Sequence, residues 1–283
     1  MLRFLTSGES HGKCLVAVLE GMVAGLTVDE KDIEHDLFRR QQGYGRGGRM
    51  TIEKDRAEVL SGVRFKKSIG APIALLIPNK DFKINELPIV KRPRPGHADL
   101  VGAMKYGRED VRDILERASA RETTSRVAVG AVCRAFLKEF GIEVLSHVVN
   151  IGGVRADTRR MSFEQIRKAA EVSPMRCADK AATKKMMARV DVARKSKDTI
   201  GGVFEVIVKG APVGLGSFVH YDRRLSAKLC AALMSIQAVK GVEVGMGFGV
   251  SETLGKFVHD EIFYDKKKGF YRDRKSTRLN SSH

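Results

Sequence analysis

Short hydrophobic runs separated by polar segments divide this chain into candidate strands and helices. Runs rich in Val, Ile and Leu, mostly bounded by Gly or Pro, are typical of β-strands. Five such runs lie at residues 14–19, 58–63, 73–77, 143–149 and 202–208. The pattern therefore predicts a strand at each of these positions.

Longer segments with apolar residues three and four positions apart predict helices. They cover residues 29–40, 123–140, 162–172, 179–196 and 226–236. The third begins with Ser162 and has Gln165 three residues later, a pairing that can cap a helix. Because strands and helices alternate without the steady rhythm of a parallel sheet, we expect an α+β fold with helices covering antiparallel sheets.

The length, the hydrophobic content and the cysteines indicate how the chain folds. With 283 residues, 43% of them hydrophobic, the chain can bury a substantial core as one large domain or two smaller ones. It shows no internal repeat and no obvious interdomain linker. Widely spaced cysteines without a CxxC pair indicate reduced core residues of a cytosolic protein, and we expect no disulfide and no metal site. These cysteines are Cys14, Cys133, Cys177 and Cys230.

The chain start and the charge bear on location and partners. The first residues become polar too soon for a signal peptide, and no apolar run reaches the roughly 18 residues of a membrane span. We therefore expect a soluble, cytoplasmic protein that does not bind membranes. The formal net charge of +17 favours an anionic partner, which could be a small molecule or a nucleic acid.

A nucleic-acid-binding protein is the main alternative to an enzyme. Aromatic residues make up 6% of the chain and Trp is absent, so an exposed stacking platform is not evident. The basic stretch 180–197 is typical of a helix with a solvated charged face. We therefore expect no nucleic-acid partner, and salt-dependent retention of RNA or DNA without a flavin-induced spectral change would favour the alternative.

Two histidines flanked by glycine are the strongest candidates for chemistry. His11 lies in Ser7-Gly8-Glu9-Ser10-His11-Gly12, and His97 follows Gly96 and precedes Ala98-Asp99. Imidazole can gain or lose a proton near neutral pH, and adjacent glycines let a ligand approach the backbone closely. Glu9, Ser10 and Asp99 are possible orienting partners. The pair indicates proton transfer on a bound substrate.

An arginine-rich loop at residues 39–49 lies between these histidines. Guanidinium groups on a flexible glycine-containing backbone can surround phosphate or carboxylate groups. The loop is not a dinucleotide-binding fingerprint, because it follows a predicted helix instead of a strand and no helix signal follows it. We interpret it as a site for an anionic, phosphorylated substrate.

A third candidate segment, residues 116–124, combines small residues with arginines and leads into the predicted helix at 123–140. Backbone N–H groups at a helix start can hold a phosphate or border a flat ring. An ordinary capped helix with surface charges explains the segment equally well. Gln237-Ala238, which follows the last predicted helix, says little alone.

Together, these motifs resemble the chorismate synthase family, in the same order over residues 1 to about 272. The motifs are Gly8-Glu9-Ser10-His11-Gly12, the arginine loop, Arg94-Pro95-Gly96-His97-Ala98-Asp99, Arg117-Ala118-Ser119-Ala120-Arg121-Glu122-Thr123 and Gln237-Ala238-Val239-Lys240-Gly241-Val242-Glu243. The resemblance implies a layered β-α-β sandwich, a homotetramer, and a lyase of the shikimate pathway to aromatic amino acids. Such a lyase removes phosphate from 5-enolpyruvylshikimate 3-phosphate by 1,4-elimination and gives chorismate. It requires reduced FMN.

The resemblance also implies residue roles. His97 would protonate the departing phosphate, and His11 would hold a proton beside the reduced flavin. Ser10, Arg40, Arg46 and Arg49 would bind the substrate. Arg40 and Arg46 also bind NADPH in bifunctional members, whereas other members need a separate flavin reductase. The residues matching the family's FMN contacts are Arg117, Ala118, Ser119, Gln237 and Ala238.

The resemblance ends near residue 274. The family would continue into a glycine-rich flavin loop, a Lys/Thr phosphate-binding segment and an Arg-x-Asp motif, whereas the polar residues 275–283 look like vector-derived sequence. We therefore expect residues 1–274 to form a chorismate synthase domain that lacks its last segment, and 275–283 to be a non-native tail. On this interpretation the chain binds FMN weakly, has little or no activity, or pairs as an inactive fragment with complete subunits.

Overall fold

A computed structural model describes residues 2–47, 52–259, 261–267 and 269–272. The chain forms two compact units, residues 1–211 and 212–283. Each unit is described by itself below. The predicted tail at 275–283 lies outside the described residues.

The larger unit begins with a four-stranded antiparallel sheet in the order β1-β2-β6-β3. Its strands are β1 (Arg3–Ser7), β2 (Cys14–Glu20), β6 (Ile73–Pro78) and β3 (Glu58–Ser61). One face of the two central strands is fully apolar, because alternate residues of each strand point to the same side. These side chains are all at most 1% exposed: Leu15, Ala17, Leu19, Ile73, Leu75 and Ile77.

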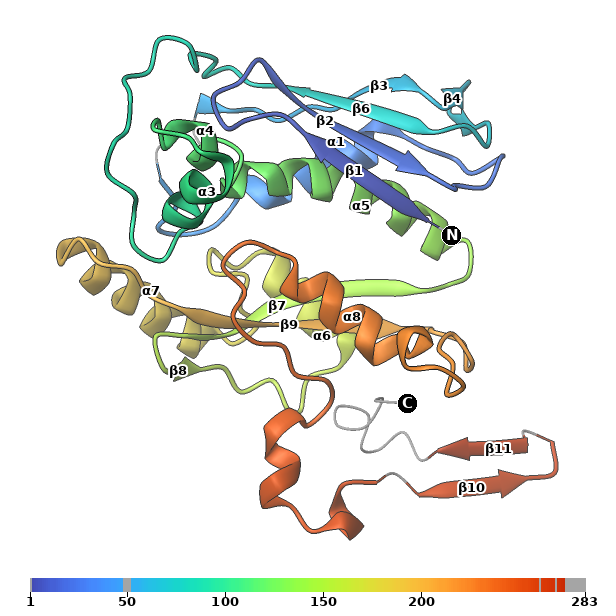
Figure 1. The fold of residues 1–283 in the computed structure, drawn as a ribbon. Coiled ribbons are helices and arrows are strands. Elements are labelled where there is room, and N and C mark those ends of the chain that lie inside the picture. Colours follow the sequence, from blue (N-terminus) through green and yellow to red (C-terminus); the bar gives the residue numbers. More distant parts are fainter. Residues whose placement is uncertain (1, 48–51, 260, 268, 273–283) are drawn as a thin grey trace. The chain divides into compact units, whose positions relative to one another are not determined.

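Two helices, α1 (Glu30–Gln41) and α5 (Thr123–Lys138), pack on this apolar face, as Figure 1 shows. Asp29 caps the start of α1 by accepting a hydrogen bond from the backbone N of Lys31. Ile33 and Leu37, four positions apart, point from α1 into the core. A small hairpin, β4 (Val63–Arg64) and β5 (Lys67–Ser68), extends the region after β3.

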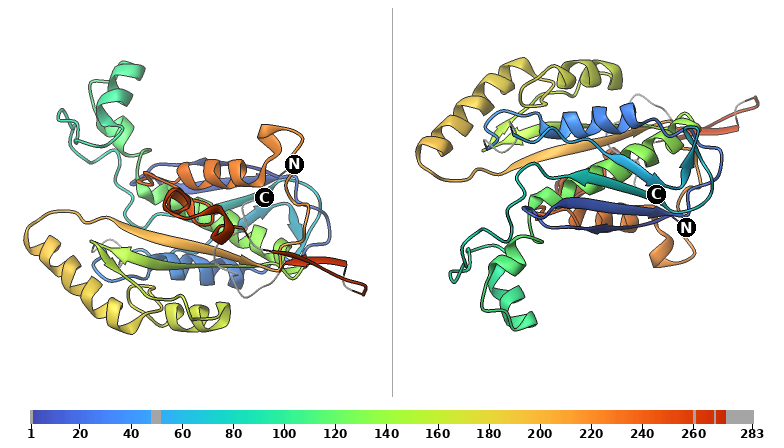
Figure 2. Two further views of the ribbon diagram at one scale, coloured as in Figure 1. Left: turned by 90° about the horizontal axis from the view of Figure 1, so that it is seen from below. Right: turned by 90° about the horizontal axis from the view of Figure 1, so that it is seen from above.

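A second antiparallel sheet has the order β8-β7-β9. Its strands are β7 (Glu143–Ile151), β8 (Val154–Arg155) and β9 (Gly202–Lys209). Helices α6 (Phe163–Glu171) and α7 (Lys180–Lys195) lie on the same side of β7 and β9 in both views of Figure 2. Leu145, Ile166 and Ala178 form a small core between this sheet and its helices.

The helical layers of the two sheets are joined by polar contacts. Arg39 at the end of α1 donates a hydrogen bond to Glu171 at the end of α6, at 2.9 Å. Tyr44, in the loop after α1, donates to Asp191 of α7 at 2.8 Å, and this hydrogen bond raises the pKa of Tyr44. The expected α+β class and the sandwich of antiparallel sheets with helices between them are confirmed.

The segment between β6 and α5 contains short helices that support the site described below. They are α3 (Asp99–Tyr106), α4 (Arg112–Leu115) and the 3-10 turn η1 (Ala120–Glu122). The smaller unit contains η2 (Tyr221–Arg223), α8 (Leu225–Met234), η3 (Gly247–Glu252), η4 (Gly255–Phe257) and the hairpin β10 (Ile262–Asp265) with β11 (Gly269–Arg272).

Most predicted elements exist, with some differences at their ends. The predicted strand at 58–63 is broken at Gly62, whose φ of +80° redirects the chain between β3 and β4. The strand β1 and the helix α3 were not predicted, because most of their large side chains are exposed and give no alternating pattern. All four cysteines are free; Cys177 is buried, and burial raises the pKa of the Cys133 thiol.

Within the described residues, no helix combines the length and apolar character that crossing a membrane requires. Nor do these residues place three His, Cys, Asp or Glu side chains together as a metal ion would need.

Candidate active site

His11 lies in the tight turn that connects β1 to β2. Gly8 has a φ of +99°, and a side chain at this position would clash with the carbonyl oxygen of Cys14. The buried amide of Asn79 donates to the carbonyl oxygens of Glu9 at 3.1 Å and Gly12 at 2.8 Å. The turn is thus held from both ends, and the His11 side chain, 24% exposed, emerges from a fixed backbone.

The carboxylate of Glu116 holds the His11 ring. Both carboxylate oxygens lie 3.0 Å from Nδ1, and one accepts the backbone N–H of His11 at 2.8 Å. On the other side of the ring, Nε2 lies 3.5 Å from an oxygen of Asp81. The sequence motifs suggested Glu9, Ser10 or Asp99 as an orienting partner; the structure places Glu116 in that role instead.

Residues predicted to contact the substrate and the flavin lie beside the His11 turn. They are Ser10 for the substrate and residues 117–119 for the flavin. Ser119 donates from its hydroxyl to the hydroxyl of Ser10 at 3.2 Å. Arg117 donates to the carbonyl oxygens of Gly8 at 3.0 Å and Thr6 at 2.7 Å. The structure therefore brings Ser10, His11, Arg117 and Ser119 together, although they come from segments more than 100 residues apart.

Residues 117–119 have the chemical character that part of an FMN site needs. Arg117 is exposed and cationic, and Ala118 and Ser119 are half-buried beside the His11 turn. A guanidinium suits a phosphate or a polar ring edge, and a small apolar residue permits close approach of a flat ring. Residues 117–119 therefore have side chains that suit FMN.

Arg40 is held by the protein itself. Its Nε donates to the Thr123 hydroxyl at 3.1 Å, and an NH2 group donates to the Ala120 carbonyl oxygen at 3.0 Å. The third nitrogen lies 3.6 Å from Asp55, and only 10% of the side chain is exposed. This arrangement ties the end of α1 to the start of α5, beside the predicted substrate site.

A buried ionic cluster, which the sequence motifs did not reveal, supports this region. Arg121 is 5% exposed; it donates to Asp55 at 2.9 Å and to the side-chain oxygen of Asn79 at 3.0 Å. Asn79 in turn holds the His11 turn, so the cluster connects Arg40, Asp55 and Arg121 to the catalytic candidate. A sequence signal did exist, since Arg121 belongs to the 117–123 motif, but nothing local marked it as buried.

The remaining predicted arginines lie on the loop after α1. Arg46 makes no hydrogen bond or ion pair within the described part of the chain, and desolvation of its charged end lowers its pKa. Because a guanidinium stays protonated in proteins, Arg46 remains a cation with donors available to a ligand. Arg49 lies outside the described residues.

His97 lies exposed in the loop before α3. Its Nδ1 is 3.2 Å from the carbonyl oxygen of Pro95. Two side-chain hydrogen bonds from Arg94, at 2.8 and 3.0 Å, hold the buried Asp99 and lower its pKa. Asp99 therefore fixes the ends of the loop that carries His97 and does not bond its ring.

Gln237 and Ala238 belong to the smaller unit, directly after α8. Ala238 has a φ of +68°, a left-handed conformation that is uncommon for a residue other than glycine. The predicted contact of Gln237 and Ala238 with FMN stays a prediction.

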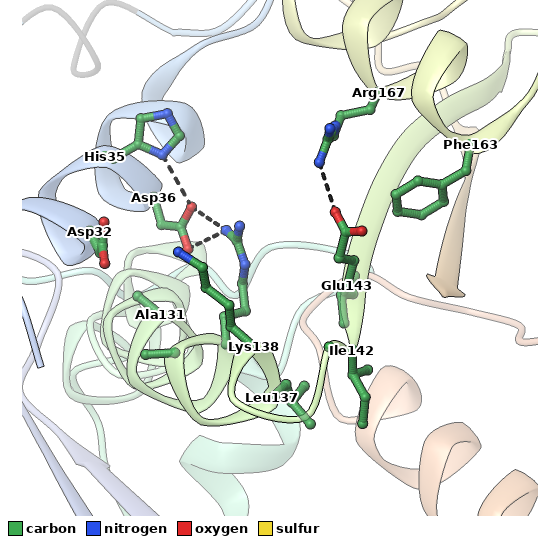
Figure 3. Close-up of a pocket in the computed structure, with 14 residues that line it drawn as sticks. Asp32, His35, Asp36, Ala131, Leu137, Lys138, Ile142, Glu143, Phe163 and Arg167 are labelled. Atoms are coloured by element: carbon green, nitrogen blue, oxygen red, sulfur yellow. Dashed lines mark hydrogen bonds and ion pairs between the residues drawn. The ribbon is translucent and has the colours of Figure 1, made fainter. Parts of the chain in front are cut away.

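A separate pocket lies between α1, α5, α6 and the start of β7, as Figure 3 shows. In it Arg134 donates to Asp36 at 2.5 Å, and Arg167 donates to Glu143 at 2.7 Å. Neither His11 nor His97 lines this pocket. Both of its arginines are thus already paired with carboxylates.

Comparison with known proteins identifies the family. The family model described as chorismate synthase matches residues 2–280. Chorismate synthase of Bacillus cytotoxicus is 52% identical over 96% of this chain and 74% of that protein, and that of Bacillus subtilis strain 168 is 51% identical with the same coverage. A solved structure titled "Crystal Structure of Chorismate Synthase" superposes with a TM-score of 0.86 and 44% identity, covering 100% of this chain and 80% of that one. On this sequence identity and shared fold, the chain belongs to the chorismate synthase family.

Proposed function

We propose that this chain acts as a carbon–oxygen lyase on 5-enolpyruvylshikimate 3-phosphate and gives chorismate and phosphate. The observation that carries the proposal is the contact of Glu116 with His11, 3.0 Å from Nδ1, beside the Ser10 and Ser119 hydroxyls. An oriented imidazole next to hydroxyl and guanidinium donors can manage a proton close to a bound anion. The product would enter aromatic amino acid biosynthesis, and we place the protein in the cytoplasm.

Substrate binding requires several cations, because the substrate carries a phosphate and two carboxylates. We assign this role to Arg46, Arg49 and Arg40, together with the Ser10 hydroxyl. Arg46 has donors to offer, whereas Arg40 already donates to Thr123 and Ala120. Arg40 would therefore contribute mainly its positive charge, and Arg46 direct hydrogen bonds.

The two histidines would serve different proton transfers. We assign to His97, on its exposed loop, protonation of the departing phosphate. His11 would hold a proton at Nε2, the nitrogen that points away from Glu116. The roles are those that the family resemblance implies. The surroundings of the two rings differ, since one ring is exposed and the other is held by a buried carboxylate.

Reduced FMN, when bound, supplies electron density for loss of the phosphate and is not consumed overall. We propose that Arg117, Ala118 and Ser119, with Gln237 and Ala238, hold it. NADPH would recharge the flavin through contacts with Arg40 and Arg46 if the protein is bifunctional; otherwise a separate flavin reductase does so. We further propose that the protein assembles as a homotetramer.

The proposed reaction is tested by anaerobic incubation of the purified chain with 5-enolpyruvylshikimate 3-phosphate and reduced FMN. The expected products are chorismate and inorganic phosphate in equal amounts, at the low yield predicted for this chain from its sequence. His97→Ala should reduce that yield about 100-fold or more, the usual scale of general acid catalysis. Release of phosphate without chorismate, or equal yields from His97→Ala, would contradict the proposal.

A further inference from the structure

The buried carboxylate of Glu116 faces N–H donors from two different segments. It is 1% exposed and accepts from the backbone N of His11 at 2.8 Å, from Nδ1 of the same residue at 3.0 Å, and from a guanidinium nitrogen of Arg112 at 3.2 Å. An ionised carboxylate can only accept hydrogen bonds. The proton of the His11 ring must therefore lie on Nδ1 for these contacts to form.

The position of this proton determines which ring nitrogen of His11 can accept another proton. When Nδ1 carries the proton, Nε2 is the atom of a neutral imidazole that can gain one. Nε2 lies on the side of Asp81, at 3.5 Å, and Asp81 is paired with Lys83 at 2.7 Å. The geometry leaves Nε2 as the nitrogen directed away from the buried carboxylate.

Arg112 donates hydrogen bonds both to the carboxylate of Glu116 and to the loop that contains Pro88. Its NH1 donates to Glu116 at 3.2 Å, and its Nε donates to the carbonyl oxygen of Pro88 at 2.7 Å. Asp110 accepts from the backbone N–H groups of Val90 and Arg112, each at 2.9 Å, and these hydrogen bonds lower the pKa of Asp110. One short stretch of chain thus orients His11 and anchors residues 88–90.

The same loop is attached directly to His11. The carbonyl oxygen of His11 accepts from the backbone N–H groups of Lys83 at 3.1 Å and Ile84 at 3.0 Å. Residues 83–90 are therefore fixed at one end by the His11 backbone and at the other by Arg112 and Asp110. The Glu116 region thus fixes the backbone on both sides of this loop.

We propose that Glu116 is a positioning residue that keeps the proton of His11 on Nδ1 and directs Nε2 toward the reacting ligand, with Arg112 orienting the carboxylate. This proposal deepens the proposed function, since it concerns the same histidine. It nevertheless makes a claim about the free protein, which can be checked without substrate or flavin.

The test is a long-range ¹H–¹⁵N correlation spectrum of the ¹⁵N-labelled full chain above neutral pH, which distinguishes the two neutral tautomers. The chain has seven histidines, and the signals of His11 are those lost in His11→Gln. In the unmodified chain we expect the pattern of a proton on Nδ1. In Glu116→Gln an NH2 group replaces one of the two acceptor oxygens that lie 3.0 Å from Nδ1. The tautomer with its proton on Nδ1 should therefore lose population, and the Nε2–H pattern should appear.

A matched control is available at a second histidine–glutamate pair. His147 of β7 is buried, and its Nε2 lies 2.7 Å from Glu205 of the neighbouring strand β9. Glu205→Gln should change the signals of His147 and leave those of His11 unchanged. The control shows that the method detects loss of a carboxylate partner and that distant charge removal does not affect His11.

Each outcome decides the proposal. A proton on Nε2 of His11 in the unmodified chain would overturn it, even if Glu116→Gln does not fold. An Nδ1–H pattern that persists in a folded Glu116→Gln variant would overturn it as well. A change confined to His11 in Glu116→Gln supports it, and absence of turnover in the assay above would contradict only the proposed reaction.

Discussion

The guanidinium of Arg94 encloses the carboxylate of Asp99 with two N–H groups, at 2.8 and 3.0 Å, and Asp99 is fully buried. A third hydrogen bond, from the backbone N of Arg94 at 3.0 Å, completes the contact. The residues between them, including His97, form a closed loop on the surface. An exposed catalytic candidate is thus attached to a rigid base.

Replacement of Asp99 by Asn should loosen this loop. The amide of Asn cannot accept from both guanidinium nitrogens, and a charge-assisted hydrogen bond contributes about 1.5–3 kcal/mol. We expect the backbone amide of Arg94, which donates to the Asp99 carboxylate, to exchange about 10-fold faster or more. Hydrogen bonds from Arg94 lower the pKa of Asp99 below its usual value of 3.8, so the carboxylate is ionised and the contact is intact above pH 3.8. The contact is lost as the pH falls through the lowered pKa.

The control for this prediction is Asp113→Asn, which removes a carboxylate paired with Arg108 on the exposed surface nearby. It should leave exchange of the Arg94 amide unchanged. Equal acceleration in both variants would show that the Arg94–Asp99 contact does not restrain the loop.

The buried cluster around Asp55 should be important for stability. Asp55→Ala would leave the guanidinium of Arg121, 4% exposed, without its principal carboxylate partner. Breaking one side of a buried ion pair costs about 3–5 kcal/mol. Urea unfolding should therefore show a loss of this size in the free energy of unfolding.

A surface ion pair provides the comparison for Asp55. Asp157→Ala removes a carboxylate paired with Arg159 at 2.9 Å, where both side chains are mostly exposed. Exposed pairs contribute little because water and salt screen them. If Asp55→Ala were no more destabilising than Asp157→Ala, the cluster would not have the structural role described here.

Glu171 predicts an acid-dependent contact between α1 and α6. Burial alone would raise its pKa, but hydrogen bonds from Arg176 and Arg39 outweigh that effect and lower it from 4.5 to about 2. Because the pKa is depressed in the folded state, the stabilisation is complete above about pH 4.5 and is lost as the pH falls toward 2. The carboxylate is 40% exposed, so we expect an effect on the order of 1 kcal/mol.

The measurement is the free energy of unfolding from pH 6 to pH 2, compared between the unmodified chain and Glu171→Gln. The difference between the two should shrink as the pH falls. Glu139→Gln, an exposed glutamate, is the control and should follow the unmodified chain. A constant offset for Glu171→Gln over the whole range would contradict the assigned cause.

The sequence predicts the regular parts of this fold well, because local patterns determine them. The helix at 163–171 begins with the expected capping box of Ser162 and Gln165, and the alternating apolar residues of β2 and β6 face the core. The histidine turn and the segment 117–119 were also identified as candidate chemistry, and they lie together.

The supporting residues of the site could not be predicted in the same way. Glu116, Asn79 and Asp55 are polar residues whose burial arises only when β1, β6 and α5 pack together. Locally each resembles an ordinary surface residue. Arg40 likewise looks like a free cation in the sequence, and only the tertiary structure shows that its donors are used by Ala120 and Thr123.

The central claim is that the loop after α1 and the His11 turn bind a multiply anionic substrate, and titration calorimetry with 5-enolpyruvylshikimate 3-phosphate tests it most directly. We predict that Arg46→Gln weakens binding about 10-fold or more, the scale of a charge-assisted hydrogen bond. Arg159→Gln, which removes an exposed arginine paired with Asp157, should bind as the unmodified chain does. Equal affinities for Arg46→Gln and the unmodified chain, or equal losses in both variants, would contradict the account.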